Sequence, residues 1–360
     1  MKFAAYAMPS FDESFGLTQG EFLRSTVDHL ASAEALGYDS VWVNEHHFHR
    51  YGGMMPSLPT MLAALAQRTS RVRLGTSVVV LPLHHPLEVA EQMAMVDLLS
   101  GGRVELGVGR GFVAHDYEVM GVSYGDAQAR LMESLDVVRK AWSGEPFTHH
   151  GTYYDFEDVQ LWPRPEQRPF PPIWLACSNT PSSFAWAGAQ GYNLLTIGYT
   201  KPASETAALT RIYRDAWAEA GHERPPTIAT HYHVVVAEER DEARRIAEAA
   251  LVEHVRLNHE SRSLARLEVG AAPSPLPIEQ LVDQGRLIAG DPDDCTRLLQ
   301  LVGAEVGTTE THCLFQFGNI RFETAQRSLE LFAEKVMPRL SIEREQPANV
   351  RQPEPQVEPG

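Results

Sequence analysis

The segment Ser40-Val-Trp-Val-Asn-Glu-His-His-Phe48 joins a strand-like run to a cluster of titratable side chains. Its first four residues include the β-branched and aromatic types that are typical of a buried strand. Glu45, His46 and His47 follow almost at once. Burying such groups costs free energy unless each one is paired or hydrogen-bonded. Because α/β enzymes build their sites from polar groups just past the carboxyl ends of buried strands, the segment predicts such a fold and such a site.

Strands and helices are expected to alternate on either side of this segment. The run Gln19–Leu36 places apolar residues near a 3.6-residue period and ends at Gly37. Strands alternating with helices imply a parallel sheet, and eight strand–helix units predict a closed (β/α)8 TIM barrel, which we expect to fill residues 1–340 as one domain. The expected strands are 3–8, 40–43, 72–81, 104–108, 173–176, 193–197, 228–237 and 312–317, and the expected helices are 19–36, 58–68, 87–99, 130–142, 182–190, 204–220, 241–257, 292–302 and 322–336.

Three segments depart from this alternation. Residues 147–165, with Tyr153, Tyr154 and Phe156, predict an inserted hairpin. Residues 261–285, which contain Ala-Ala-Pro-Ser-Pro-Leu-Pro, predict a mobile loop after strand seven, because long loops inside a domain are usually functional or disordered. The tail 341–360 is rich in Pro and Glu, has few apolar residues and predicts disorder.

Charge and cysteine content exclude several classes of protein. The 360-residue chain has a formal net charge of −16, whereas nucleic acids and anionic membranes select basic surfaces. Its three cysteines are an odd number without the spacing of a metal site, which suits a reducing cytoplasm. No signal peptide and no apolar run of membrane-spanning length is evident. We therefore expect a cytoplasmic protein with neither nucleic-acid nor membrane partners.

The barrel brings polar groups from distant parts of the sequence to one rim. At this rim we expect Glu45 and His46 after strand two, Ser77 and Val78 in strand three, Gly109 and Arg110 after strand four, and Ser178 and Asn179 after strand five. His231 and His233 are expected along strand seven. A zinc site is an alternative for the first group, but adjacent histidines on an extended chain point in opposite directions. We expect no metal.

Two of these segments suggest a site for a phosphorylated, flat ligand. The run Gly107-Val-Gly-Arg-Gly111 lacks the third glycine and the acidic partner of a Rossmann fingerprint. It does offer close backbone approach and one arginine, which matches phosphate oxygens bidentately. Ser178-Asn-Thr180 precedes a helix, so these residues either only cap it or help its free N–H groups to bind a phosphate. Arg130 is a third candidate, and Cys177 is expected to be a buried, inert thiol.

Ordered motifs along residues 2–340 resemble the bacterial luciferase-like flavin monooxygenase family. No single motif is specific, but together they are highly specific for the family and much less so for a substrate. They are the opening Met-Lys-Phe, Leu36-Gly-Tyr-Asp-Ser-Val-Trp, Glu45-His-His-Phe48, Leu74-Gly-Thr-Ser-Val-Val-Val-Leu-Pro82, His85-Pro86, Leu99-Ser-Gly-Gly-Arg103, Gly109-Arg-Gly111 and Arg327-Ser-Leu-Glu-Leu-Phe-Ala-Glu-Lys-Val-Met-Pro338.

The resemblance implies a two-component monooxygenase that uses reduced FMN delivered by a separate NAD(P)H:flavin reductase. In that family oxygen adds to flavin C4a, and the resulting hydroperoxide oxygenates a small organic substrate. The matching positions make His46 catalytic, place Glu45 near the flavin ring, and put a non-proline cis bond between Ser77 and Val78 beside the ring. The positions matched to the cofactor, the last four on its phosphate side, are Ser77, Val78, Gly109, Arg110, Arg130, Ser178 and Asn179. A homodimer is also expected.

Departures from the luciferase pattern argue against light emission. The light-emitting subunit has a cysteine where this chain has Gly109 and a glutamate at the position aligned with Ser178, and the segment 261–285 is short for the luciferase lid. A dark monooxygenase acting on a secondary metabolite fits better. The main alternative is an F420-dependent oxidoreductase, since such relatives share the barrel. A catalytically silent flavin-binding protein is disfavoured because Glu45, His46 and Arg110 are all present.

Overall fold

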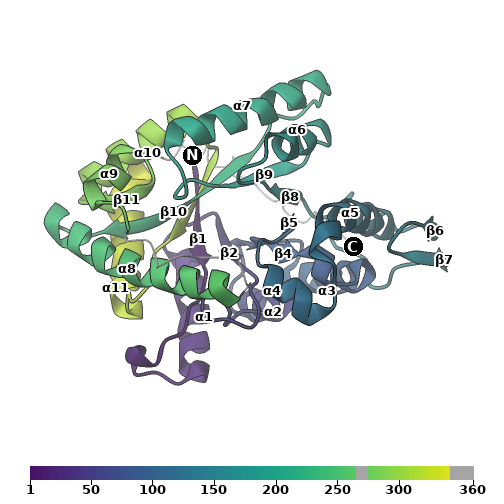
Figure 1. Cartoon of the computed structure of the whole chain (residues 1–360), viewed down its shortest axis with the longest axis horizontal. Coiled ribbons are helices and arrows are strands. Elements are labelled where there is room, and N and C mark those ends of the chain that lie inside the picture. The colour runs from purple at the N-terminus through teal and green to yellow at the C-terminus, as the bar shows by residue number, and fades with distance from the viewer. Residues whose placement is uncertain (265–274, 341–360) are drawn as a thin grey trace, which may run out of the picture.

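Eight parallel strands close into a barrel in the computed structural model, which describes residues 1–264 and 275–340. The ring is closed by β10, which pairs with both β9 and β12, and helices surround it (Figure 1). The predicted (β/α)8 barrel is therefore confirmed. In ring order the strands are β1 (Lys2–Ala7), β2 (Ser40–Val43), β3 (Arg73–Thr76), β5 (Val104–Gly109), β8 (Ile173–Ala176), β9 (Asn193–Ile197), β10 (Ile228–Val236) and β12 (Glu310–Leu314).

The ring strands are buried on both faces. All nine residues of β10 and all five of β12 are buried, which is the usual state of strands in a parallel sheet covered by helices. The two strands run side by side in a register that sets His231 opposite His312. His312 in turn lies opposite Ala4 of β1, which faces Ser40 of β2. Side chains from four neighbouring strands therefore meet at one level of the barrel.

The third barrel strand is interrupted, contrary to the prediction of one strand over 72–81. β3 ends at Thr76, and β4 (Val79–Val80) pairs separately with β5. The break lies at the Ser77–Val78 peptide bond, which is cis as predicted. The continuous apolar run concealed this break, because residue type alone does not report the conformation of a peptide bond.

The outer helices follow the prediction, with shifted ends. α1 begins with a capping box in which Thr18 and Glu21 bond each other's backbone N–H groups, an arrangement that fixes a helix start. α8 runs well past its predicted end at residue 257. These helices are α1 (Gln19–Ala35), α2 (Leu58–Arg68), α3 (Pro86–Ser100), α5 (Ala127–Trp142), α6 (Pro181–Ala189), α7 (Ala203–Glu219), α8 (Arg240–Leu264), α10 (Pro292–Val306) and α11 (Phe322–Leu331).

Several short elements were not predicted. β11 pairs with β10 outside the ring, and the last predicted helix continues beyond α11 through a π-helical turn into α12. None of the helices within the described residues is long and apolar enough to cross a membrane. The additional elements are the helices α4 (Ala114–Met120), α9 (Ile278–Asp283) and α12 (Met337–Leu340), the turns η1 (Glu13–Phe15), η2 (Leu81–Leu83), η3 (Tyr124–Asp126) and η4 (Phe332–Val336), and the strand β11 (Leu287–Gly290).

The inserted hairpin is confirmed as antiparallel β6 (Phe147–His150) and β7 (Asp155–Val159), which project from the barrel beyond α5 (Figure 1). The loop predicted over 261–285 is only partly tested. α8 occupies its start and α9 lies near its end, so these parts are helical rather than irregular. Residues 265–274 of that loop, and the predicted disordered tail 341–360, lie outside the described residues.

Candidate active site

A cavity of about 560 Å³ lies at the carboxyl ends of the barrel strands. Its wall is formed by residues that end or follow β1, β2, β3, β5, β8 and β9, as the barrel assignment predicted. Of the nine site residues proposed from the sequence, eight line this cavity and Arg130 does not. The eight are Glu45, His46, Ser77, Val78, Gly109, Arg110, Ser178 and Asn179.

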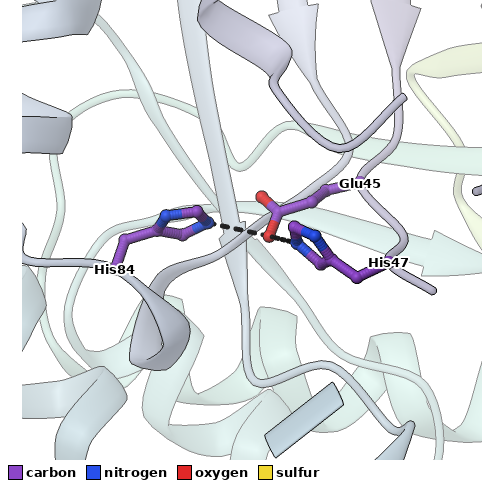
Figure 2. A group of neighbouring side chains, drawn as sticks. All are labelled: Glu45, His47 and His84. Carbon is purple, nitrogen blue, oxygen red and sulfur yellow. Dashed lines mark hydrogen bonds and ion pairs between the residues drawn. The ribbon is translucent and has the colours of Figure 1, made fainter. Parts of the chain in front are cut away.

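Glu45 is held by two histidines, as Figure 2 shows. Its Oε1 accepts hydrogen bonds from His47 Nε2 and His84 Nε2, each at 2.8 Å, and its Oε2 accepts the backbone N–H of Val80 at 3.2 Å. Burial alone would raise the pKa of Glu45, but the bonds from His47 and His84 outweigh it and lower the pKa. The carboxylate is therefore ionised and fixed in position at neutral pH.

His84 was not foreseen as a site residue. It follows the 3-10 turn η2, and its partner Glu45 lies 39 positions earlier in the chain. Burial works to lower the pKa of His84, but the hydrogen bond and charge of Glu45 raise it overall. The sequence signal was present in His84-His85-Pro86, which follows directly on an apolar strand.

Among the described residues, two groups of side chains have the spacing of metal ligands. The ligand atoms of Glu45, His47 and His84 lie within 4.8 Å of one another, and imidazole nitrogens with a carboxylate oxygen are a donor set that zinc accepts. In the structure the two imidazoles instead donate to the same carboxylate oxygen. His46, His49 and Asp116 form the second group. The adjacent histidines 46 and 47 thus belong to different groups.

His46 lines the cavity, whereas His47 is buried against Glu45. Burial, with a smaller effect from His49, lowers the pKa of His46 to about 3, against the opposing charge of Glu45. Its ring centroid lies 5.5 Å from that of Tyr51. A neutral imidazole in this position can donate one hydrogen bond and accept another.

The cis peptide and a glycine form a flat part of the wall. Ser77 and Val78 line the cavity together with Gly109. A Cβ atom on Gly109 would lie 3.3 Å from Ala176 Cβ, which is tight, and 2.8 Å from Val78 Cγ2, closer than such carbons approach in proteins. Glycine therefore avoids a displacement of Val78 where the two strand ends come together, and the wall stays free of a projecting side chain.

Asn44 is a site residue that the sequence analysis missed. It is buried and lines the cavity. Neither Nδ2 nor Oδ1 of its amide has a hydrogen-bond partner among the described residues. A buried amide without partners is unfavourable by about 1–3 kcal/mol. The amide is therefore an unsatisfied donor and acceptor in the wall of the cavity.

Part of the cavity wall is suited to an anion. Arg110 is the only lining residue, within the described part of the chain, that carries a fixed positive charge. Ser178 and Asn179 line the same cavity, just before α6. Thr180, the N-cap residue of α6, makes no side-chain capping bond. Pro181 has no N–H and the Ser183 N–H donates to the Thr180 carbonyl oxygen at 3.0 Å, so the Ser182 N–H is the group of the first turn that could face a phosphate.

Lys201 holds the loop that carries Ser178 and Asn179. Its Nζ donates to the carbonyl oxygen of Ser178 and to Asn179 Oδ1, so it fixes the loop that precedes α6. Arg130, by contrast, places its guanidinium over the ring of Tyr153, 4.5 Å from the centroid, in the inserted hairpin. Cys177 is buried, and this burial raises the pKa of its thiol to about 12, as expected for an inert group.

Comparison with known proteins assigns the family. A family model for luciferase-like monooxygenases matches residues 1–310, and the chain belongs to that family. A crystal structure of monooxygenase RslO1 from Streptomyces bottropensis has a TM-score of 0.87 at 29% identity, covering 95% of this chain and 100% of that one. The predicted family and fold are thus confirmed.

Sequence relatives include enzymes with different cofactors. 4-Hydroxyprotoasukamycin monooxygenase of Streptomyces nodosus subsp. asukaensis is 30% identical over 86% of this chain and 84% of its own length. The oxygenase component of the flavin-dependent trigonelline monooxygenase of Acinetobacter baylyi is 30% identical over 63% and 62%. An F420-dependent glucose-6-phosphate dehydrogenase of Amycolatopsis mediterranei is 27% identical over 88% and 94%. The class common to these named relatives is oxidoreductase.

Two uncharacterized proteins of Sinorhizobium fredii align at higher or similar identity but over less of their length. They are 38% and 31% identical to this chain, which covers 55% and 63% of them. The chain thus spans between half and two thirds of these relatives.

Proposed function

We propose that the protein is the oxygenase component of a two-component monooxygenase that uses reduced FMN. The observation that supports this most directly is the set of groups that line one cavity. The fixed cation of Arg110, the close approach of Gly109 to Val78, and His46 all belong to its wall. This set fits a cofactor with one phosphate and a flat, polar-edged ring.

The residues present fit such a cofactor. Arg110, Ser178 and Asn179 would hold its phosphate, with charge-assisted bonds from the arginine. Val78 and Gly109 would face the ring, and the unpartnered amide of Asn44 would find partners on the edge of the isoalloxazine. When bound, reduced flavin activates molecular oxygen and supplies the electrons that allow one oxygen atom to reach the substrate.

The residues of this chain would position the reacting groups and donate or accept protons. Neutral His46 would donate a hydrogen bond to the reacting oxygen or accept a proton from the substrate, the form of assistance that general acid–base catalysis provides. Glu45, fixed by His47, would keep the adjoining backbone and its neighbour in place. Tyr51 and Phe112 line the same cavity and would limit the access of water to the reaction.

The substrate would be a small organic molecule with no net charge. Tyr51 and Phe112 lie against His46, and Tyr6 and Met8 line the same cavity, in which Arg110 is the one fixed cation among the described residues. Such walls bind apolar and aromatic bodies. The named relatives act on 4-hydroxyprotoasukamycin and trigonelline. A secondary metabolite with a ring is the substrate class we favour.

F420-dependent hydride transfer is the second candidate, because a dehydrogenase of that kind aligns over 94% of its length. F420 carries a phosphodiester and additional carboxylates, which would call for several cationic groups. Arg110 is the single fixed cation that lines the cavity in the described residues. This observation favours FMN over F420.

An oxygen-labelling experiment separates the two candidates. The purified protein is mixed anaerobically with reduced FMN or reduced F420 and a panel of cyclic substrates, and ¹⁸O₂ is then admitted. We expect tight binding of reduced FMN and one ¹⁸O atom in the product by mass spectrometry. Oxidation of reduced F420 by a substrate without oxygen would contradict the proposal. Addition of a flavin reductase with NAD(P)H should sustain turnover, and light scattering should report the expected homodimer.

A further inference from the structure

A line of buried polar groups crosses the inside of the barrel below the cavity. Ser77 Oγ lies 2.8 Å from His231 Nε2. His231 Nε2 lies 3.2 Å from His312 Nδ1, and His312 Nε2 lies 3.2 Å from Glu310 Oε1. The register of β10 and β12 sets the two histidines opposite each other. The four side chains thus form one unbroken hydrogen-bonded chain.

The chain connects two cavities at opposite ends of the barrel. Ser77 lines the proposed active site. Glu310, the first residue of β12, lines a second cavity of about 140 Å³ at the amino-terminal ends of the strands. Lys2 and Arg73 line that basal cavity too, and Lys2 is exposed, so the cavity communicates with solvent. The hydrogen-bonded chain therefore begins at the basal cavity and ends at the proposed active site, as a route for protons requires.

The direction of each hydrogen bond follows from the surroundings. His231 Nδ1 donates to the carbonyl oxygen of Thr196 at 2.8 Å, which leaves Nε2 as an acceptor for Ser77 and His312. Burial would raise the pKa of Glu310, but the bonds from His312 and Ser40 outweigh it and lower the pKa. Because Glu310 and His231 Nε2 both accept, His312 can donate to either neighbour through the ring nitrogen that carries the proton.

Stability alone does not call for these groups. The interior of such barrels is usually filled by branched apolar side chains, and a buried ion pair is often no more stabilising than an apolar set of the same volume. A continuous array of a carboxylate, two imidazoles and a hydroxyl is instead the arrangement that moves a proton over a distance. Each step is the transfer of one proton between two nitrogens or oxygens about 3 Å apart.

We propose that Glu310, His312 and His231 form a proton relay that reprotonates Ser77 from the basal face of the barrel. A proton passes from His312 Nδ1 to His231 Nε2 and on to Ser77 Oγ, while Ser77 releases its own hydroxyl proton into the active site. The His312 ring starts with its one proton on Nδ1, and Nε2 takes up a proton by way of Glu310 and the basal cavity as Nδ1 gives its own away. Reorientation of the ring then restores a proton on the His231 side before the next transfer. One proton enters, one leaves, and no electrons move.

The relay rests on the proposed function for its use. If reduced FMN is bound as its monoanion, oxygenation of a substrate S follows FMNH⁻ + H⁺ + O₂ + S → FMN + SO + H₂O. Each turnover therefore takes up one proton. A route from the opposite face of the barrel would supply this proton without a path for water through the active-site cavity.

The first test uses the ligand-free protein and therefore does not depend on the function. NMR of histidine-labelled protein measures how fast the ring N–H protons of His312 exchange with deuterated solvent. Glu310→Gln keeps the shape and an accepting oxygen but cannot relay a proton. It should slow exchange by about tenfold, the low end expected on losing one proton-transfer group. The matched control is His233→Gln, a buried histidine of the same strand as His231 that lies outside the chain.

Ser77→Ala tests the direction of supply. Exchange at His312 should be unchanged in this variant, since the proton enters from the basal side. Slower exchange in Ser77→Ala with normal exchange in Glu310→Gln would overturn the relay as proposed, and so would equal slowing in His233→Gln. Thermal unfolding of each variant confirms that the fold is retained.

The second test uses the enzyme loaded with reduced FMN. Glu310→Gln and His312→Gln should form product about tenfold to a hundredfold more slowly, with unchanged affinity for reduced FMN and a larger solvent isotope effect. Unchanged rates and isotope effects would contradict the relay. If wild-type protein forms no product from reduced FMN while Glu310→Gln slows exchange, the oxygenase proposal fails and the proton route stands.

Discussion

Glu45 Oε1 and His84 Nε2 lie 2.8 Å apart, although 39 positions separate the two residues. Glu45 is the first charged residue after β2, and the contact ties it to the turn that follows β4. Because His47 donates to the same oxygen, the carboxylate is held from both sides and cannot turn into the cavity freely. His46, the next residue, is thereby presented to the cavity wall.

Removing His84 should destabilise the fold in a pH-dependent way. The lowered pKa of Glu45 gives stability that is present above its ordinary value of 4.5 and is lost as the pH falls through the lowered pKa. The raised pKa of His84 gives stability that is present below 6.5 and is lost as the pH rises through the raised pKa. The contact therefore contributes most between these two values.

Urea unfolding of His84→Gln checks this window. The free energy of unfolding should fall by about 1–3 kcal/mol near pH 5.5, as for other buried charged hydrogen bonds, and by less near pH 8.5. His85→Gln is the control, because His85 is exposed and makes no capping hydrogen bond. A loss that is equal at both pH values, or equal in the control, would count against the assigned ion pair.

Arg110 and Arg130 should differ in their effect on flavin binding. Arg110 lines the cavity, whereas Arg130 packs on Tyr153 in the hairpin. Arg110→Ala removes a charge-assisted contact of about 1.5–3 kcal/mol and should weaken reduced FMN at least about tenfold. Arg130→Ala should leave the affinity nearly unchanged in the same anaerobic titration. If both variants lose affinity equally, the phosphate does not lie where we place it.

Replacing Asn44 should raise the stability of the protein and weaken flavin binding. In the ligand-free protein its buried amide has no partner among the described residues. Asn44→Leu removes this unpaired group at similar volume and should raise the free energy of unfolding by about 1 kcal/mol. The same change should weaken flavin binding, because the ring edge loses its partner. Chemical unfolding and an FMN titration measure the two effects, and a variant that is both less stable and equally good at binding would refute this role.

Some of the site could be predicted from the sequence because it depends on local order. Glu45 and His46 follow a buried strand directly, and the barrel rule then places them at the rim. His47, two positions from Glu45, is a local partner, but His84 could not be predicted in this way, since it reaches Glu45 only after two strands have paired with their neighbours. Lys201 is similar, because its contacts with the loop before α6 depend on where β9 ends.

The barrel interior shows a second limit of prediction. Strand eight was expected to begin at His312, but β12 begins at Glu310. A glutamate at a strand start predicts a solvent-facing end when it is taken by itself. Glu310 is instead buried, because Ser40 Oγ donates to its carboxylate at 2.7 Å and His312 completes the pair. Polar burial of this kind is decided by partners on other strands, and the sequence of one strand does not contain them.

His46 and His47 should separate catalysis from stability. His46 lines the cavity with a pKa of about 3, so a neutral ring faces the reacting groups. His46→Ala should lower the rate of product formation by about 10²–10⁴-fold, the usual range for general acid–base assistance, and barely change the affinity for FMN. His47 is 5% exposed and donates to Glu45. His47→Ala should therefore lower the free energy of unfolding by about 1–3 kcal/mol, because it leaves a buried carboxylate with one partner fewer.

Single-turnover rates, FMN titrations and urea unfolding of both variants give the comparison. If His47→Ala slowed the reaction more than His46→Ala while remaining as stable as the wild type, the catalytic histidine would be the wrong one of the pair, and the placement of the flavin would still stand.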